Sequence, residues 1–218
     1  MALPLAGLAG AALATIGIAM LAGVRSGPMP FLLAGVAVAA MCGALVSLVL
    51  NLSRNPFAAS EAIFWMMGSF TDRSRVHLML AAPIIAIGSY LLWRLGAAFD
   101  AMTLGDEVAE TLGHDPGHVR AHVVAGVALT VGAATAVTGI IGFVGLIVPH
   151  LVRGYLGARP SHVMAGSAIG GAILVLAADV AVRLMAPYAD IRVGVLTATL
   201  GAPFFLWLVL RLRRGGAS

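Results

Sequence analysis

The densest group of ionisable side chains in the sequence lies in one polar stretch, residues 99–121. This stretch reads FDAMTLGDEVAETLGHDPGHVRA and holds five of the nine acidic residues, namely Asp100, Asp106, Glu107, Glu110 and Asp115. Acidic, partly apolar helices in a loop suit two roles: a solvated connector, or a docking element that fits a groove on a partner protein. The residues alone leave both interpretations open.

The same stretch carries signals for the start and the end of helices. Thr103, followed by acids at 106 and 107, predicts a helix start, because acidic residues stabilise the positive end of a helix dipole. Apolar residues repeat with helical spacing on one predicted face, at Leu104, Val108, Ala109 and Leu112. Gly113 predicts a left-handed stop, and Asp115-Pro116 predicts a new N-cap with proline in the first turn. We therefore expect a helix, a glycine turn and a second helix.

A second pair of charges lies inside an apolar run. Asp179 and Arg183 are four residues apart, on one face of a predicted helix. Charged residues within a membrane helix are costly, and they often contact a substrate. The spacing also lets the two side chains neutralise each other, with Arg183 reaching towards the interface. We favour this structural pair over a substrate contact.

Other residue patterns that could do chemistry are weak. Glycines at 139, 142 and 145 do not form a phosphate loop, because no strand precedes them and no lysine follows; their spacing favours close helix packing. His150 would need partners to bind a metal, and four other histidines, His114, His118, His122 and His162, are scattered along the predicted cytoplasmic edges. We therefore predict no metal site. Cys42 is the one cysteine and cannot form an internal disulfide.

Composition places the chain in a membrane. Of its 218 residues, 61% are hydrophobic and only 10% are charged, and the mean hydropathy is +1.02. A soluble domain carries about 25% charged residues, so most of this surface must face hydrocarbon. All 13 basic residues are arginines dispersed between apolar runs. The net charge of +4 therefore does not indicate nucleic-acid binding.

Seven apolar segments approach the roughly 20 residues that a membrane-spanning helix needs. They cover residues 3–24, 31–52, 78–95, 122–138, 139–157, 163–185 and 193–210. We predict helix throughout each segment, because a helix satisfies its own backbone hydrogen bonds in lipid. The chain is thus expected to be an all-α integral membrane protein, a polytopic helical bundle forming a single transmembrane domain over residues 1–218.

Arginine placement predicts the orientation, because basic residues favour cytoplasmic loops. A cytoplasmic C-terminus puts eight arginines inside, namely Arg25, Arg94, Arg120, Arg153, Arg159, Arg211, Arg213 and Arg214. It leaves four outside, namely Arg54, Arg73, Arg75 and Arg192. The polar loop 99–121 is then cytoplasmic, and the N-terminus is external.

The external loop, residues 53–77, contains a predicted short helix. Asn55-Pro56 is typical of an N-cap and first turn, and Gly68 predicts the end. Phe57, Phe64 and Trp65 would lie on this helix. Such aromatic residues either anchor the helix at the membrane interface or cover a central pathway, and both possibilities stay open.

Five sequence stretches, in order, carry a family resemblance. They are WMMGSF at 65–70, LGDEVAETLG at 104–113, GFVGLIVPHLVR at 142–153, AADVAVRL at 177–184 and VGVLTATLGAPFFLWLVLR at 193–211. Together they resemble the FecCD-type permeases, which are membrane subunits of bacterial ATP-binding-cassette (ABC) importers for ferric siderophores, haem and cobalamin. The resemblance is clear from about residue 31 to 214 and weaker before.

The resemblance implies a type II ABC importer permease fold in the bacterial inner membrane. Such a permease is not an enzyme and binds no cofactor; ATP and Mg²⁺ bind to a separate ATPase subunit. The implied partners are that ATPase, a second permease subunit (identical or homologous) and a periplasmic substrate-binding protein.

The resemblance also implies roles for particular residues. The family's coupling loop, which receives the ATPase, matches Gly105, Asp106, Glu107, Ala109, Leu112 and Gly113. Its external gate matches residues 31–68, including Phe64, Trp65 and Gly68.

The resemblance implies ten membrane helices, and our seven spans match the last seven. The family's early Asn-Pro-Leu-Ala and Leu-Gly-x-x-x-Gly-Ala signatures have no counterpart here, so we expect the N-terminal three helices to be lacking. A non-transporting truncated remnant is one alternative to an importer. An ion-coupled secondary transporter is another, although Asp179 is its one candidate for a carboxylate at mid-membrane.

Overall fold

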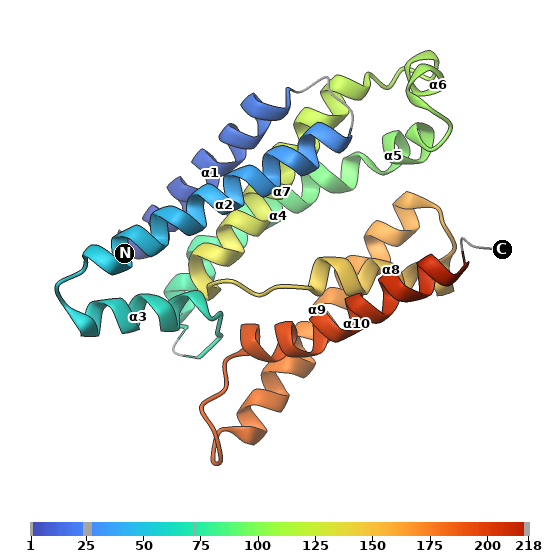
Figure 1. The fold of residues 1–218 in the computed structure, drawn as a ribbon. Helices are drawn as coiled ribbons and strands as arrows, with labels where there is room; N and C mark the ends of the chain where they lie inside the picture. The colour runs from blue at the N-terminus through green and yellow to red at the C-terminus, as the bar shows by residue number, and fades with distance from the viewer. Residues whose placement is uncertain (1, 24–27, 72, 216–218) are drawn as a thin grey trace. The chain divides into compact units, whose positions relative to one another are not determined.

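The computed structural model describes residues 2–23, 28–71 and 73–215, and these residues form helices and no strand (Figure 1). The helices are α1 (Ala2–Ala22), α2 (Pro28–Leu52), α3 (Pro56–Met66), α4 (Arg75–Arg94), α5 (Gly96–Met102), α6 (Asp106–Thr111), α7 (Pro116–Thr138), α8 (Val144–Leu156), α9 (Pro160–Met185) and α10 (Val193–Gly215). Arg25 lies outside the described residues, as do the side chains of Arg211, Arg213 and Arg214.

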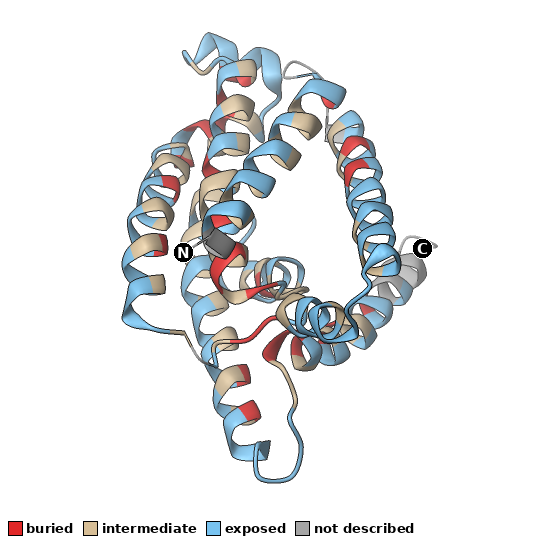
Figure 2. Cartoon of the chain, turned by 90° about the vertical axis from the view of Figure 1, so that its left-hand side faces the viewer, coloured by how far each residue is buried: buried red, intermediate tan, exposed pale blue. Residues whose placement is uncertain are grey.

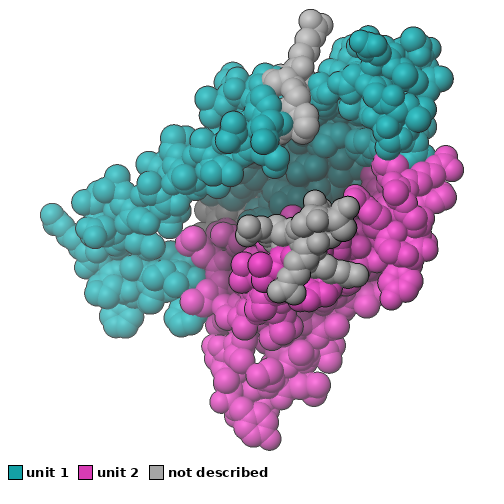
Figure 3. Space-filling model, turned by 45° about the vertical axis from the view of Figure 1, so that its right-hand side comes forward, with its two compact units in different colours: residues 1–64, 73–137 teal, residues 65–72, 138–218 magenta. Residues whose placement is uncertain are grey.

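The chain divides into two compact units, which Figure 3 colours separately. Unit 1 contains residues 1–64 and 73–137, and unit 2 contains residues 65–72 and 138–218. The short segment 65–72, which is part of the external loop, belongs to the same unit as the C-terminal helices. That all 218 residues act as one permease domain stays a prediction.

Small residues let the helices of unit 1 pack closely. Ala81 on α4 and Ala133 and Val137 on α7 form a buried cluster, and Leu8 of α1 packs against it. Gly88 and Gly126 bring α4 and α7 together, because a Cβ on Gly88 would lie 2.8 Å from the Gly126 carbonyl oxygen. Close approach through small residues is typical of membrane helices. Within this unit, α5 and α6 lie at the end opposite α3 (Figure 1).

In unit 2, α8 packs against α9, and α10 packs against both. Gly166 and Gly170 of α9 face Val152 and Val148 of α8, so the two helices approach closely there. A second buried cluster contains Ala178 and Val182 of α9 and Val193, the first residue of α10. The loop 186–192 lies at the end of this unit opposite the C-terminus of α10 (Figure 1).

Few residues of either unit are buried (Figure 2), and the exposed residues include many large apolar ones, as a membrane protein requires. Among the described residues, five helices are long and apolar enough to cross a bilayer: α1, α2, α4, α7 and α9. Buried residues make up between 6% and 28% of their apolar windows, so these helices expose their apolar faces to lipid or to other subunits. In these five segments the structure is helical, as predicted, and that each helix crosses the membrane stays a prediction.

The segment 139–157 differs from the prediction. Its helix, α8, has only 13 residues, and residues 139–143 before it are not helical. A helix of that length covers about 20 Å, less than the roughly 30 Å of a hydrocarbon core. Residues 139–143 are irregular, with a positive φ at Gly139 and at Phe143. Our prediction of helix through residues 139–143 was wrong, and the Ile140 N–H donates instead to the Met66 carbonyl oxygen at 3.3 Å.

Candidate functional site

The polar loop folds into a short helix, α6, between the end of α5 and the start of α7. We call residues 103–118 the polar knuckle. Its helix begins at Asp106, after Gly105, whose φ of 106° is a conformation that side chains disfavour. Thr103 was predicted to start this helix, which was wrong. Its hydroxyl instead donates to the Asp100 carbonyl oxygen at 2.7 Å, so Thr103 ends α5.

The glycine stop of α6 is confirmed. Gly113 has a φ of 86°, and its N–H donates to the Glu110 carbonyl oxygen at 2.9 Å. The His114 N–H turns back to the Ala109 carbonyl oxygen, also at 2.9 Å. These two bonds satisfy carbonyl groups that the end of a helix would otherwise leave unpaired. The knuckle therefore turns sharply after one and a half turns of helix.

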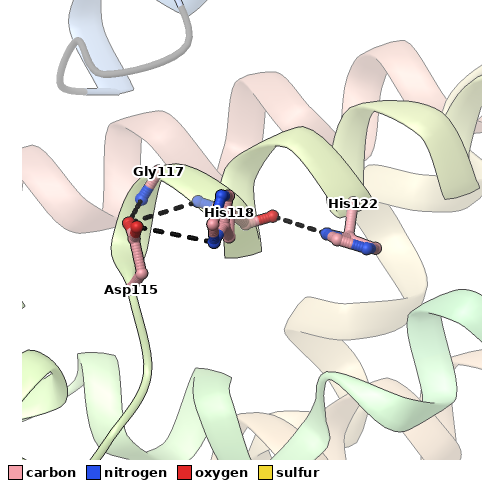
Figure 4. A network of polar contacts seen from close by, with 4 residues as sticks. All are labelled: Asp115, Gly117, His118 and His122. Atoms are coloured by element: carbon pink, nitrogen blue, oxygen red, sulfur yellow. Dashed lines mark hydrogen bonds and ion pairs between the residues drawn. The ribbon is translucent and has the colours of Figure 1, made fainter.

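Asp115 starts the next helix, as predicted. Its Oδ1 accepts the backbone N–H groups of Gly117 at 2.7 Å and His118 at 3.3 Å (Figure 4). The His118 ring also lies against this carboxylate, with Nδ1 3.5 Å from Oδ2. The helix that begins here is α7 itself, which continues into the membrane span. The expected second knuckle helix is thus the first part of that span.

One ion pair joins α6 to α7. Asp106, the first residue of α6, contacts the Arg120 guanidinium at 2.5 Å. The Arg120 side chain is only 21% exposed, whereas Asp106 is about half exposed. Sequence reasoning placed Arg120 only as a flanking charge, because a pair 14 residues apart has no helical spacing to reveal it. A movement of α6 would therefore be transmitted to the start of α7.

The knuckle presents apolar side chains to solvent beside its acids. Leu104 is 65% exposed, Val108 41% and Leu112 58%, while Ala109 is fully buried. The predicted single apolar face is therefore divided: Ala109 packs inwards, and the three larger residues point outwards. Glu107 and Glu110 are exposed among them. Exposed apolar residues rimmed by charges are typical of a protein interaction site.

The residues of the predicted external gate differ in solvent exposure and in the compact unit to which they belong. Asn55 caps α3 as expected, because its Oδ1 accepts the Phe57 N–H at 3.0 Å. Phe64 is 52% exposed near the end of α3. Gly68 is buried, and the indole N–H of Trp65 is buried without a hydrogen-bond partner. Trp65 and Gly68 belong to unit 2, whereas Phe64 belongs to unit 1.

Three segments of unit 2 meet at Gly68. The Ser69 N–H donates to the Thr138 carbonyl oxygen at 2.7 Å, and the Ile140 N–H donates to the Met66 carbonyl oxygen at 3.3 Å. The Gly194 N–H donates to the Gly68 carbonyl oxygen at 3.1 Å. We call this contact of residues 65–70, 138–141 and 193–194 the glycine junction. Sequence reasoning noted Gly139 only as one of three glycines spaced for helix packing and missed Gly194.

Asp179 and Arg183 form the predicted pair on α9, with Arg183 Nε 2.7 Å from an Asp179 carboxylate oxygen. The Arg183 side chain is 64% exposed and Asp179 only 17%, which agrees with an arginine that reaches away from the packed face. Across the part of the chain that the structure describes, no three His, Cys, Asp or Glu residues gather closely enough to hold a metal ion.

Comparison with known proteins gives these features a family context. The profile of the FecCD transport family matches residues 1–211, so the likeness also includes the first 30 residues, where the motifs were weak. The hemin transport system permease protein HmuU of Yersinia pestis is 38% identical over 84% of this chain and 54% of its own length. The Fe(3+) dicitrate transport system permease protein FecD of Escherichia coli is 36% identical over 98% of this chain and 66% of its own.

Two further matches, one to a curated protein and one to a solved structure, agree with the family match. The vitamin B12 import system permease protein BtuC of Vibrio cholerae is 37% identical over 83% of this chain. The chain thus spans between about half and two thirds of the length of these relatives. A solved structure of a transporter assigned to the metal-chelate ABC type, in an inward-facing conformation, superimposes with a TM-score of 0.78 at 28% identity. This match covers 94% of the chain and 63% of that structure. The family profile, the curated relatives and the shared fold together show that the chain belongs to the FecCD transport family.

Proposed function

We propose that this chain forms the membrane-spanning permease of an ABC importer that carries a metal chelate or related compound, such as a ferric siderophore, ferric citrate, haem or cobalamin, across the bacterial inner membrane. Membership of the FecCD transport family supports the transport role. The substrate range follows the relatives, whose names specify hemin, ferric dicitrate and vitamin B12.

The polar knuckle is the observation that carries this proposal. It combines exposed Leu104, Val108 and Leu112 with exposed Glu107 and Glu110, outside the apolar spans. Asp106 ties the knuckle to α7 through Arg120. An ATPase that binds the exposed residues can therefore displace α7, a membrane helix, through this ion pair. ATP and Mg²⁺ bind to that partner, and this chain supplies no catalytic residue.

The orientation belongs to the same proposal. The knuckle faces the cytoplasm, where the ATPase has access to ATP, and the C-terminus lies on the same side. Arg94 and Arg120 flank the loop that contains the knuckle, in agreement with the positive-inside rule. The loop 53–77 and the loop 186–192 then face the periplasm, where a substrate-binding protein delivers the cargo.

Transport follows as alternating access through a gated conduit between two permease subunits. ATP binding and hydrolysis displace the knuckle, the attached helices tilt, and the pathway opens on one side while it closes on the other. The residues of α3, with exposed Phe64 near the end, cover the external side. The walls offer apolar and small side chains, so the substrate-binding protein selects most of the cargo.

Docking of the ATPase is tested by reversing one charge on the knuckle. In the permease coexpressed with its cognate ATPase, Glu107→Arg should weaken copurification of the ATPase by about tenfold, since charge complementarity guides such interfaces. ATP-driven uptake should fall with it. Glu61→Arg, on an exposed position of α3, makes the same charge change away from the knuckle and serves as the control for ATPase copurification. Unchanged copurification and uptake in Glu107→Arg would contradict the proposal.

The driving force and substrate are tested in proteoliposomes that contain the permease and ATPase. Labelled ferric siderophore, ferric citrate, haem and cobalamin are supplied in turn with their binding proteins. We expect uptake of one class that requires ATP on the ATPase side. Uptake that follows a proton or sodium gradient without ATP would instead identify the ion-coupled transporter considered above.

A further inference from the structure

The glycine junction leaves no room for side chains. A Cβ on Gly68 would lie 2.2 Å from the Ile140 carbonyl oxygen, and one on Gly139 would lie 2.2 Å from the Trp65 carbonyl oxygen. A Cβ on Gly194 would lie 2.2 Å from the Met67 carbonyl oxygen and 2.4 Å from that of Ile140. These obstacles are backbone atoms, which cannot turn aside as a flexible side chain can. The three segments therefore meet through their main chains.

This contact also satisfies the polar groups of an irregular segment. Residues 139–143 lack helical hydrogen bonds, and unpaired backbone groups in lipid cost several kcal/mol each. The Ile140 N–H finds the Met66 carbonyl oxygen, and the Thr138 carbonyl oxygen accepts the Ser69 N–H. Val193 is 1% exposed and Ser69 6%, so the contact is shielded from solvent. Opening the junction would leave these groups without their present partners.

Residues 139–143 also contact α10 at a second position, through Phe143. Phe143 has a φ of 66°, a left-handed conformation that is rare for a bulky residue. Its side chain lies against Gly201, where a Cβ would approach the Phe143 Cβ to 2.4 Å. A strained residue of this kind persists only when its surroundings hold it in place. Residues 139–143 are thus fixed to α10 at both ends, through Gly194 and Gly201.

We propose that Gly68, Gly139 and Gly194 are positioning residues for gating: they fasten the C-terminal end of α3 to the first turn of α10 and keep it there throughout the transport cycle. This proposal rests on the proposed function, because it gives α3 the role of an external gate. The end of α3, the segment 138–141 and the start of α10 then move as one piece. A force that a partner applies to the loop 186–192 would act on α10, into which the loop leads, and through α10 on the C-terminal end of α3. The polar knuckle takes no part in this route.

The first experiment measures the junction without transport. Hydrogen–deuterium exchange in nanodiscs should show at least hundredfold protection for the amides of Ser69, Ile140 and Gly194, although none of them pairs inside a helix. Gly194→Ala should remove most of that protection. Gly142→Ala is the matched control, because a Cβ there meets nothing within 4 Å. Fast exchange of these amides in the unsubstituted protein would overturn the proposal.

The second experiment asks whether the junction opens during transport. A Ser69→Cys/Thr138→Cys pair, in a Cys42→Ser background, joins two segments that already share a hydrogen bond of 2.7 Å. Oxidised and reduced samples of the same protein should take up substrate at equal rates, because the junction stays closed. Loss of uptake on oxidation, with recovery on reduction, would show that the junction must open and would overturn the proposal.

The two experiments separate this proposal from the proposed function. If the protein transports no chelate in either redox state, the importer assignment fails. The exchange of the three amides still decides whether the junction holds α3 in place.

Discussion

The polar knuckle and the glycine junction both hold irregular backbone next to membrane helices, but they do so by opposite means. In the knuckle, side chains do the work: Asp115 caps α7, and Asp106 binds Arg120. In the junction, main-chain groups bind one another, and the three segments approach through the glycines Gly68, Gly139 and Gly194. The knuckle is exposed to water, which can replace a lost hydrogen bond. The junction is shielded, so nothing replaces a bond lost there.

This difference predicts which region tolerates substitution. Water screens the charges of the knuckle and weakens each of its interactions. The junction depends on the absence of atoms, so that any added carbon displaces backbone. We therefore expect small, separable effects in the knuckle and large, cooperative effects in the junction.

The largest effect is expected for Gly139→Ala. The substitution places a methyl group 2.2 Å from a carbonyl oxygen at a residue whose φ is 76°. Overpacking and the left-handed conformation together should cost roughly 3 kcal/mol or more. Unfolding in mixed detergent and SDS measures this free energy, with Gly142→Ala as control. A cost below about 1 kcal/mol would show that the junction adjusts easily, and the contrast with the knuckle would disappear.

Gly113 provides the matching test in the knuckle. Its φ is 86°, but a Cβ there meets nothing within 4 Å. Gly113→Ala should therefore cost about 1 kcal/mol, from the backbone conformation alone. Gly113→Asn should cost less, since asparagine tolerates this conformation. The same asparagine at Gly139 should be as harmful as alanine or worse. Equal costs of asparagine at the two positions would contradict our account.

Removal of the Asp115 cap should have a smaller effect. Asp115→Ala leaves the N–H groups of Gly117 and His118 to water, at a cost of about 1 kcal/mol. Asp115→Asn keeps an oxygen that can accept these bonds and should recover most of the stability. Exchange of the first amides of α7 measures the local effect. If Asp115→Asn were as unstable as Asp115→Ala, the carboxylate charge rather than the cap would be responsible.

The smallest effect is expected for the ion pair between α6 and α7. A double-mutant cycle with Asp106→Ala and Arg120→Ala should give a coupling of about 0.5 kcal/mol, because Asp106 is about half exposed. The coupling should decrease as salt is raised from 50 mM to about 500 mM. A coupling above about 2 kcal/mol that does not decrease with salt would show that this exposed ion pair is strong. That result would contradict the expected difference between the knuckle and the junction.

The same difference explains what the sequence could reveal. Asp115-Pro116, Gly113 and Asn55 are local signals that the residue type itself carries, and the structure has each cap or stop at the predicted residue. Apolar length was enough to locate α1, α2, α4, α7 and α9. The prediction that Thr103 starts α6 was wrong, because Gly105, two residues later, adopts a backbone conformation that threonine avoids and directly precedes the helix.

The junction could not be found in this way. Its bonds join main-chain groups that every residue possesses, and its partners lie up to 126 residues apart, as between Gly68 and Gly194. Gly194 lies in an apolar stretch where glycine is common, so its type indicates nothing about its place. The break at residues 139–143 was hidden for the same reason: the segment is as apolar as a helix, and only its neighbours show that it is not one.

The irregular stretch 139–143 before α8 has a consequence for how the protein enters the membrane. A continuous apolar helix satisfies its own backbone hydrogen bonds in lipid, whereas the Ile140 N–H of this stretch depends on the Met66 carbonyl oxygen. The Gly194 contact is completed only after the ribosome has synthesised some forty further residues. We therefore expect this segment to wait beside the translocon, and the order of synthesis to set the order of assembly.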